Sequence, residues 1–392
     1  MCTISKVGQP ELHYTCERSV PETRHRGPGR AAGVTFGYLD DVPLREVDGL
    51  AGAPWTRPLT GQLDQLVVQS ELLSDNPLGD PARRPLLVYR PPGLGHHAHE
   101  PVPSVYVIQG YSGQVDMWLA RSAFEPTLIE RLDAMFEARE CAPAIVVFVD
   151  AWTSLGGSQF LNSTSTGRYM DYLCDEVVAF VDGRYPTIAD RQHRGLAGKS
   201  SGGYGAMVVP MFRPDVFGAL ASHAGDALFE CCYQREFPLI ARQLRDYFEG
   251  SYESLLEQVA EADHFDWSRY GTAFSAYGYA AAYTPDPARP GEAVLPFEIS
   301  TGRLVDEVWE RWLALDPVRM APRYAEALGS MRRIYLDAGR SDEWFLDLGA
   351  EAFSQELRRL GVEHSLDLFE GAHGGISYRY PAAIRELVSA LR

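Results

Sequence analysis

Short apolar runs alternate with amphipathic stretches over most of the chain. A strongly apolar run at 102–108 and a fully apolar run at 144–149 predict buried strands of a parallel sheet. Apolar positions recur at helical spacing over 126–139, which predicts a helix that covers the sheet, and a second helix is predicted over 169–185. Further strands are predicted near 62–68, 86–89, 193–197, 216–223, 333–338 and 365–369. Strands and helices in this alternation are typical of an α/β fold with a mostly parallel central sheet.

The alternation stops between residues 227 and 330. This segment is rich in aromatic and acidic residues and contains a proline-rich interruption at 284–290. We expect a mainly helical insertion that caps the active site, with a dimer surface as the alternative role. Residues 61–226 and 331–392 then form the core, and residues 1–60 are expected to be a partly flexible N-terminal extension because they show no sustained periodicity.

The pattern G-x-S-x-G occurs once in a context that suits chemistry. Gly198, Ser200 and Gly202 follow a predicted strand and precede a small, apolar predicted helix. In a strand–turn–helix of this kind the glycines permit a sharp turn that exposes the central hydroxyl at the end of the strand. Ser200 is therefore the candidate nucleophile, which requires a base, a residue that orients the base and donors for an oxyanion.

Later in the chain, acidic residues and a histidine follow the last two predicted strands. Asp342 lies in a loop and is the better candidate for the orienting carboxylate, whereas Asp337 is still on the strand or just leaving it. His373 lies in a glycine-rich loop after the final strand and is the candidate base; His223 is a weaker rival because it precedes any acid. The order serine, acid, histidine is that of α/β-hydrolases.

The oxyanion donors and the pocket are predicted from loops at the same edge of the sheet. Gly110 and Tyr111 follow a buried strand, so the Tyr111 N–H is expected to provide one donor and the Ser201 N–H, directly after the nucleophile, the other. Because ligands of open α/β sheets bind at the carboxyl ends of the strands, the pocket is expected there. Its candidate residues are Gln114, Trp152, Phe160 and Asp226.

Net charge and composition argue against several classes of binding partner and cofactor. A net charge of −17 argues against nucleic acid and against anionic membrane surfaces. The first residues lack the apolar core of a signal peptide, so a cytoplasmic location is expected. The six cysteines show no metal spacing, and three histidines at 96–99 have no second ligand cluster nearby, so no metal or organic cofactor is expected.

These motifs resemble the putative-esterase branch of the α/β-hydrolases, which includes S-formylglutathione hydrolases, antigen 85 mycolyltransferases and enterochelin esterases. The matching stretches are 105–111, 198–206, 337–342 and 371–374, within a likeness that spans 62–226 and 331–392. The resemblance implies an α/β-hydrolase fold, a catalytic triad of Ser200, Asp342 and His373, and oxyanion donors on Tyr111 and Ser201. Lys199 departs from the family, which commonly has a histidine or another neutral residue at that position.

The expected function is hydrolysis of a small-molecule carboxylic ester through an acyl-enzyme. Two alternatives stay open: an acyltransferase that passes the acyl group to an alcohol or amine, and a non-catalytic binding protein on the same scaffold. Homo-oligomerisation, with the insertion as a dimer surface, also stays open.

Overall fold

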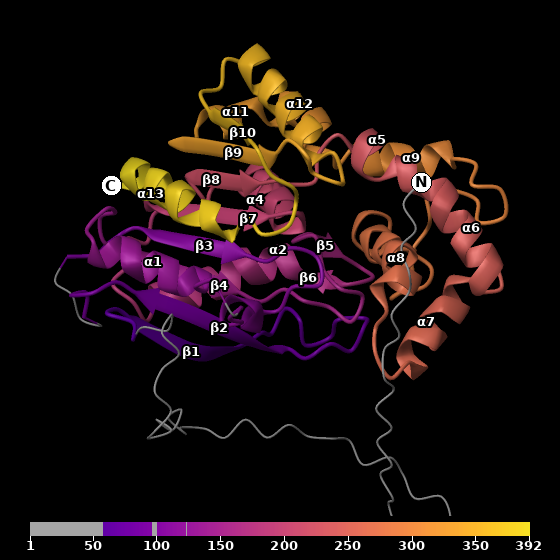
Figure 1. Ribbon diagram of the computed structural model, residues 1–392, viewed down its shortest axis with the longest axis horizontal. Helices are drawn as coiled ribbons and strands as arrows, with labels where there is room; N and C mark the ends of the chain where they lie inside the picture. The colour runs from indigo at the N-terminus through magenta and orange to yellow at the C-terminus, as the bar shows by residue number, and fades with distance from the viewer. Residues whose placement is uncertain (1–57, 96–99, 123) are drawn as a thin grey trace, which may run out of the picture. The chain divides into compact units, whose positions relative to one another are not determined.

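A computed structural model describes residues 58–95, 100–122 and 124–392. The N-terminal residues 1–57, which include most of the expected extension, and the histidine cluster at 96–99 lie outside the described residues. The described chain forms a central sheet with helices on both faces (Figure 1). It therefore has the α/β-hydrolase fold that the resemblance implies.

The central sheet has eight strands in the order β1-β2-β4-β3-β7-β8-β9-β10. Strand β2 runs antiparallel to both of its neighbours, β1 and β4. The other strands of this sheet, β4, β3, β7, β8, β9 and β10, are parallel to one another. Each lies where an apolar run predicts a strand. The bounds are β1 Gln62–Gln69, β2 Arg83–Arg90, β3 Ser104–Ile108, β4 Ile145–Val149, β7 Arg194–Lys199, β8 Ala219–His223, β9 Arg333–Gly339 and β10 Ser365–Phe369; a separate small ribbon pairs β5 Asn162–Ser163 with β6 Gly167–Arg168.

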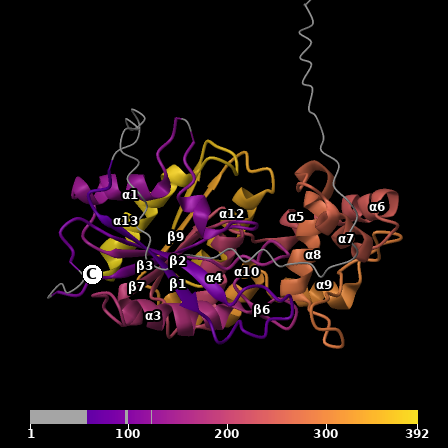
Figure 2. The ribbon, with the colours of Figure 1, turned by 90° about the horizontal axis from the view of Figure 1, so that it is seen from below.

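Successive residues of a strand point alternately into two apolar layers, one on each face of the sheet. Along β2, Leu87 and Tyr89 face one layer, whereas Leu86 and Val88 face the other. Helices α1 and α13 cover the first face, and α3 and α4 cover the second (Figure 2). The core helices are α1 Leu128–Glu137, α2 Tyr169–Asp171, α3 Val178–Asp182, α4 Ser201–Phe212, α12 Leu346–Arg359 and α13 Tyr380–Leu391, with a π-helical turn Tyr172–Val177 joining α2 to α3.

Local sequence explains where helix α1 begins. The Thr127 hydroxyl accepts a hydrogen bond from the Glu130 N–H, and the Glu130 carboxylate accepts one from the Thr127 N–H. This reciprocal cap satisfies two amides that the first turn leaves free. From there Leu128, Leu132 and Phe136 bury their side chains against the sheet, as the spacing predicts.

The segment between β8 and β9 is helical. Its helices are α5 Phe229–Cys232, α6 Phe237–Tyr247, α7 Tyr252–Glu261, α8 Thr272–Tyr283, α9 Asp306–Leu313, α10 Pro317–Met320 and α11 Ala325–Gly329. Helices α5 to α9 lie beyond one end of the strands (Figures 1 and 2), whereas α10 and α11 return alongside the sheet and contact α4. The aromatic residues of the segment, among them Phe237, Tyr283 and Trp312, pack against one another in a continuous apolar cluster with α4 and α12. None of the helices in the described ranges is long and apolar enough to cross a membrane.

Candidate active site

Ser200 occupies the turn between strand β7 and helix α4. Its backbone has φ 58° and ψ −126°, a conformation that a residue with a side chain rarely adopts. The turn is held in place because the Ser200 N–H donates to the His223 carbonyl at 3.0 Å and the Ser200 carbonyl accepts from the Tyr204 N–H at 2.8 Å. The strained turn leaves the hydroxyl at the carboxyl end of the sheet.

The two glycines of the motif are required by close backbone approach. A Cβ on Gly198 would lie 2.3 Å from the Gly202 carbonyl oxygen, and one on Gly202 would lie 2.5 Å from the Ile108 carbonyl oxygen. Both distances are far below van der Waals contact, so neither position accepts a side chain without backbone movement. The glycines therefore let β7, α4 and the end of β3 meet at Ser200.

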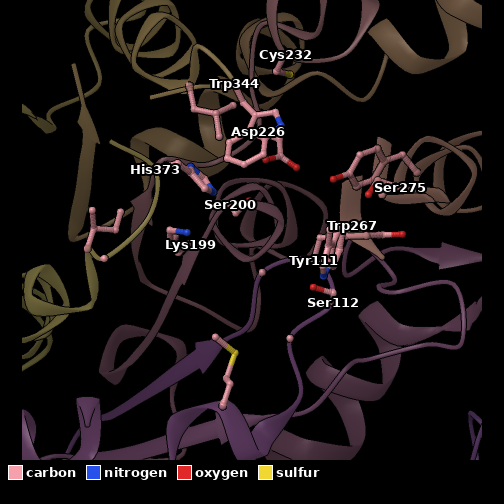
Figure 3. Close-up of a pocket in the computed structure, with 18 of the residues that line it drawn as sticks. Tyr111, Ser112, Lys199, Ser200, Asp226, Cys232, Trp267, Ser275, Trp344 and His373 are labelled. Carbon is pink, nitrogen blue, oxygen red and sulfur yellow. The ribbon is translucent and has the colours of Figure 1, made fainter. Parts of the chain in front are cut away.

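His373 and Asp342 are joined by a hydrogen bond. The His373 Nδ1 lies 2.7 Å from Asp342 Oδ2, and both residues are buried. The Trp344 N–H donates to Asp342 Oδ1 at 2.9 Å, so the carboxylate is fixed from its other side. The Glu343 carboxylate accepts from the His373 N–H at 3.0 Å, and the Trp344 ring packs edge-on against the imidazole. Figure 3 shows the imidazole directed toward Ser200.

His223 and Asp337, the alternative base and acid that the sequence suggested, form a second histidine–aspartate pair. His223 Nδ1 lies 2.7 Å from Asp337 Oδ1, and both side chains are fully buried within the sheet. Asp337 also accepts from Arg379 Nε at 3.0 Å and from the Tyr335 hydroxyl at 3.1 Å. Burial alone raises the pKa of Asp337, but His223 and Arg379 outweigh it and hold that pKa below its ordinary value. Neither member of this pair lines the cavity described below.

The turn after β3 lies directly against the serine. A Cβ on Gly110 would be 3.1 Å from the Lys199 carbonyl oxygen and 4.0 Å from Ser200 Oγ. Among the described residues, no backbone carbonyl accepts a hydrogen bond from the N–H of Tyr111 or of Ser201. The Tyr111 hydroxyl donates to the Leu155 carbonyl at 2.6 Å, which anchors this side chain away from its own amide.

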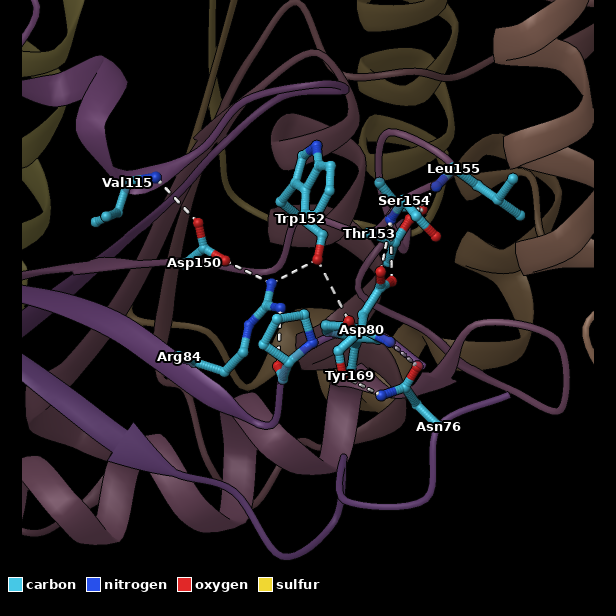
Figure 4. A network of polar contacts seen from close by, with 12 residues as sticks. Asn76, Asp80, Arg84, Val115, Asp150, Trp152, Thr153, Ser154, Leu155 and Tyr169 are labelled. Carbon is cyan, nitrogen blue, oxygen red and sulfur yellow. Dashed lines mark hydrogen bonds and ion pairs between the residues drawn. The ribbon is translucent and has the colours of Figure 1, made fainter. Parts of the chain in front are cut away.

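A buried ion pair holds the loops that follow β3 and β4 (Figure 4). Asp150, at the end of β4, accepts from the Val115 N–H at 3.0 Å and from Arg84 Nη2 at 2.5 Å. The same guanidinium donates to the Trp152 carbonyl. Burial raises the pKa of Asp150, although the Arg84 charge opposes that effect. The network ties the loops after β3 and β4 to strand β2.

Ser200 and His373 open into a cavity of about 730 Å³. The core contributes Tyr111, Lys199 and Trp344 to its lining. The insertion contributes the facing wall, which consists of Cys232, Tyr233, Glu236, Trp267, Gly271, Thr272, Ser275 and Tyr279. The cavity is therefore a space between the sheet edge and the insertion.

Asp226 lies at the boundary between these two walls. Its Oδ2 accepts hydrogen bonds from the Tyr233 hydroxyl at 2.7 Å, from Ser201 Oγ at 3.2 Å and from Gln159 Nε2 at 3.2 Å. Burial raises the pKa of Asp226 against the effect of these donors. The carboxyl group thus links the first residue of α4 to the insertion.

Of the four pocket residues that the sequence suggested, only Asp226 lines this cavity. Gln114 is exposed and precedes the short helix Val115–Trp118. Trp152 is held by its carbonyl in the network described above, and Phe160 is buried against α4, where a Cβ on Gly205 would meet its ring at 2.7 Å. Trp152 and Phe160 therefore take part in structural contacts near the site, and Gln114 lies on the surface outside the cavity lining.

Sequence reasoning did not assign Trp344, Glu236 or Lys199 to the pocket. Trp344 could have been found, because it comes two residues after the candidate acid. Glu236 could not, since no motif in the insertion indicates which of its polar residues faces the core. Burial raises the pKa of Glu236, in spite of the neighbouring Arg235.

Three solved structures have folds similar to the fold of this chain. They are a ferulic acid esterase (18% identity, TM-score 0.52, 85% of this chain and 98% of that one), the fluorophosphonate-binding serine hydrolase F of Staphylococcus aureus (15%, 0.51, 85% and 99%) and an S-formylglutathione hydrolase from Agrobacterium tumefaciens (15%, 0.51, 86% and 98%). Identities this low show a shared fold only.

Comparison with curated proteins gives no match. A family model described as "Putative esterase" matches residues 81–379 of the 392, from strand β2 to the turn before helix α13. The match includes the serine turn, the histidine–aspartate pair and the insertion between β8 and β9. The chain therefore belongs to the putative-esterase family of carboxylic ester hydrolases with the α/β-hydrolase fold.

Proposed function

We propose that this protein hydrolyses a carboxylic ester through an acyl-enzyme on Ser200, with His373 as the base and Asp342 as the residue that orients it. The observation that carries the proposal is the 2.7 Å hydrogen bond between His373 and Asp342 at a cavity that Ser200 also lines. An imidazole whose Nδ1–H is held by a carboxylate presents its Nε2 lone pair to a hydroxyl.

In the first half-reaction His373 Nε2 takes the Ser200 proton while Ser200 Oγ attacks the ester carbonyl carbon. The carbonyl electron pair moves onto oxygen, and the N–H groups of Tyr111 and Ser201 donate hydrogen bonds to this oxyanion. Collapse of the tetrahedral intermediate breaks the bond to the alcohol, which leaves with the proton from His373. Water then repeats the sequence on the acyl-enzyme and releases the acid.

The free amides of the turn after β3 and of helix α4 support the assignment of the oxyanion donors. Gly110 is close enough to Ser200 to bring the Tyr111 amide to the reacting carbonyl. Ser201 is the first residue of α4, so its N–H has no partner within the helix and also benefits from the helix dipole.

Covalent labelling by a fluorophosphonate tests the nucleophile. We expect stoichiometric labelling of the peptide that contains Ser200, and loss of labelling in Ser200→Ala. Ser201→Ala is the matched control, because it removes the neighbouring hydroxyl but keeps the backbone N–H. For hydrolysis of short acyl esters, Ser200→Ala should lower kcat by roughly 10⁴- to 10⁶-fold with an unchanged unfolding transition. Near-normal turnover by Ser200→Ala would refute the proposal.

A further inference from the structure

Lys199 is an unusual residue in this chain. Lys6 and Lys199 are the only lysines among the 36 basic Lys and Arg residues, so every other such cation is an arginine. One of the two lysines thus stands directly before the proposed nucleophile, at the end of strand β7. The two cations differ physically, since an ammonium is a compact point charge with rotatable donors, whereas a guanidinium is a broad planar fork.

The Lys199 side chain faces the cavity. It is partly buried, lines the same space as Ser200 and His373, and is drawn beside them in Figure 3. Its ammonium makes no hydrogen bond or ion pair with any residue that the structure describes. Burial lowers the pKa of Lys199, and the more distant charges of Asp342, Asp226 and Glu343 oppose that effect.

The carboxylates around Lys199 already accept hydrogen bonds from other groups. Asp342 holds His373 and the Trp344 amide, and the Glu343 carboxylate accepts from the His373 N–H. Asp226 accepts from three donors on one oxygen. A cation in a partly desolvated site without a direct partner is unfavourable, and a ligand that supplies the partner is correspondingly favoured.

We propose that Lys199 binds an anionic group of the ester substrate, a carboxylate or a phosphate, close to the reacting carbonyl. This inference rests on the proposed function, because the anion is located relative to Ser200. Residues 199 and 200 are adjacent, so the ammonium can lie at most on the order of 10 Å from the nucleophile. The anionic group therefore belongs to a short acyl chain or a short alcohol, with only a few bonds between the charge and the ester.

The test compares esters that differ in charge but hardly in shape. On the acyl side, ethyl hydrogen glutarate is compared with ethyl 5-oxohexanoate, in which a methyl ketone replaces the carboxylate. On the alcohol side, butyryl glycolate is compared with butyryloxyacetone. Ethyl 4-phosphonobutyrate, also compared with ethyl 5-oxohexanoate, tests a phosphate-like anion. The readout is kcat/KM from chromatography of the released acid and alcohol, for the full-length chain.

We expect at least one anionic ester to have a kcat/KM about 10- to 100-fold above that of its neutral partner, the range for one charge-assisted hydrogen bond in a desolvated site. Lys199→Met should abolish this preference, and Lys199→Arg should keep part of it. Arg340→Met is the matched control. It removes one positive charge from an exposed residue outside the cavity lining, and the preference should persist.

Equal or lower kcat/KM for every anionic ester in the wild-type protein would overturn the inference without any variant. A preference that survives in Lys199→Met would also overturn it. In either case hydrolysis of the neutral esters and labelling of Ser200 would leave the proposed function standing. Absence of both hydrolysis and labelling in the wild-type protein would refute the proposed function itself, and this inference with it.

Discussion

Two aspartates, Asp342 and Asp337, each hold a histidine at 2.7 Å, and replacing each by asparagine separates their roles. Asp342 uses one oxygen for His373 and the other for the Trp344 N–H. An asparagine at 342 must turn its NH₂ toward one of these two donors. If it faces His373, Nδ1 must become the acceptor, and the proton moves to Nε2. The imidazole can then no longer take a proton from Ser200.

The expected magnitude for Asp342→Asn follows from this tautomer change. Loss of the correct tautomer in a serine–histidine–aspartate triad lowers kcat by about 10⁴-fold. The side chain keeps its volume and at least one hydrogen bond, so the free energy of unfolding should change by no more than about 1 kcal/mol.

Asp337→Asn should have the opposite profile. Asp337 is fully buried and accepts from His223, Arg379 and the Tyr335 hydroxyl on two oxygens. Asparagine offers only one oxygen and removes the buried carboxylate that His223 and Arg379 share, although Arg379 keeps its ion pair with the exposed Asp367. Breaking such a buried pair costs about 3–5 kcal/mol. Any loss of activity should therefore follow loss of folded protein.

The assay measures kcat for a short acyl ester beside urea unfolding of each variant. The unmodified protein and Ser200→Ala are the references for full and background turnover. If Asp337→Asn were fully folded and inactive while Asp342→Asn kept turnover, the assignment of the acid would be refuted, and the buried pair would have to take its place.

Three further predictions follow from single contacts. Gly110→Ala places a Cβ 3.3 Å from Ser200 Cβ, so the turn must shift, and kcat should fall about 10-fold or more with little change in melting temperature; a lower melting temperature with unchanged kcat would contradict this. Asp226→Ala removes the acceptor that three buried donors share, of which Gln159 and Tyr233 still have the Tyr283 hydroxyl, and should destabilise the fold by about 1–3 kcal/mol, whereas Asp226→Asn keeps an acceptor and should cost less, as urea unfolding will measure. Burial raises the pKa of Asp133, but bonds from the Gly61 and Thr60 amides and the Tyr89 hydroxyl hold it below its ordinary 3.8. The stability that Asp133→Asn removes should therefore be complete above about pH 5 and shrink as the pH falls through the lowered pKa; a difference between wild type and variant that is the same at pH 7 and pH 3 would contradict the linkage.

The strands of the core could be predicted because their signals are local. A buried parallel strand such as β4 needs only a short apolar run, and the turn at Ser200 needs two glycines. The order of serine, acid and histidine along the chain also depends on sequence alone. These features suffice to identify the family, as the family match over 81–379 shows.

The walls of the cavity depend on contacts between distant segments. Phe160 follows a strand at the correct edge, but its backbone has φ 53°, and its ring is buried against α4 instead of facing the ligand space. His223 and Asp337 are direct neighbours in the register of β8 and β9, a pairing that no sequence pattern indicates. Which face of each helix in the insertion meets the core is likewise decided by packing alone.

The insertion leaves the sheet after β8 and returns at β9, and these strands are adjacent. Because β8 and β9 are parallel, the insertion starts at the carboxyl end of β8 and returns to the amino end of β9, and Ser200, Asp342 and His373 all lie outside it. One recombination event at its two junctions can replace the far wall of the cavity as a single unit. Evolution, or an engineer grafting the corresponding segment of a relative, can thus alter substrate preference and leave the acid–base groups unchanged, provided that the graft supplies a hydroxyl for Asp226.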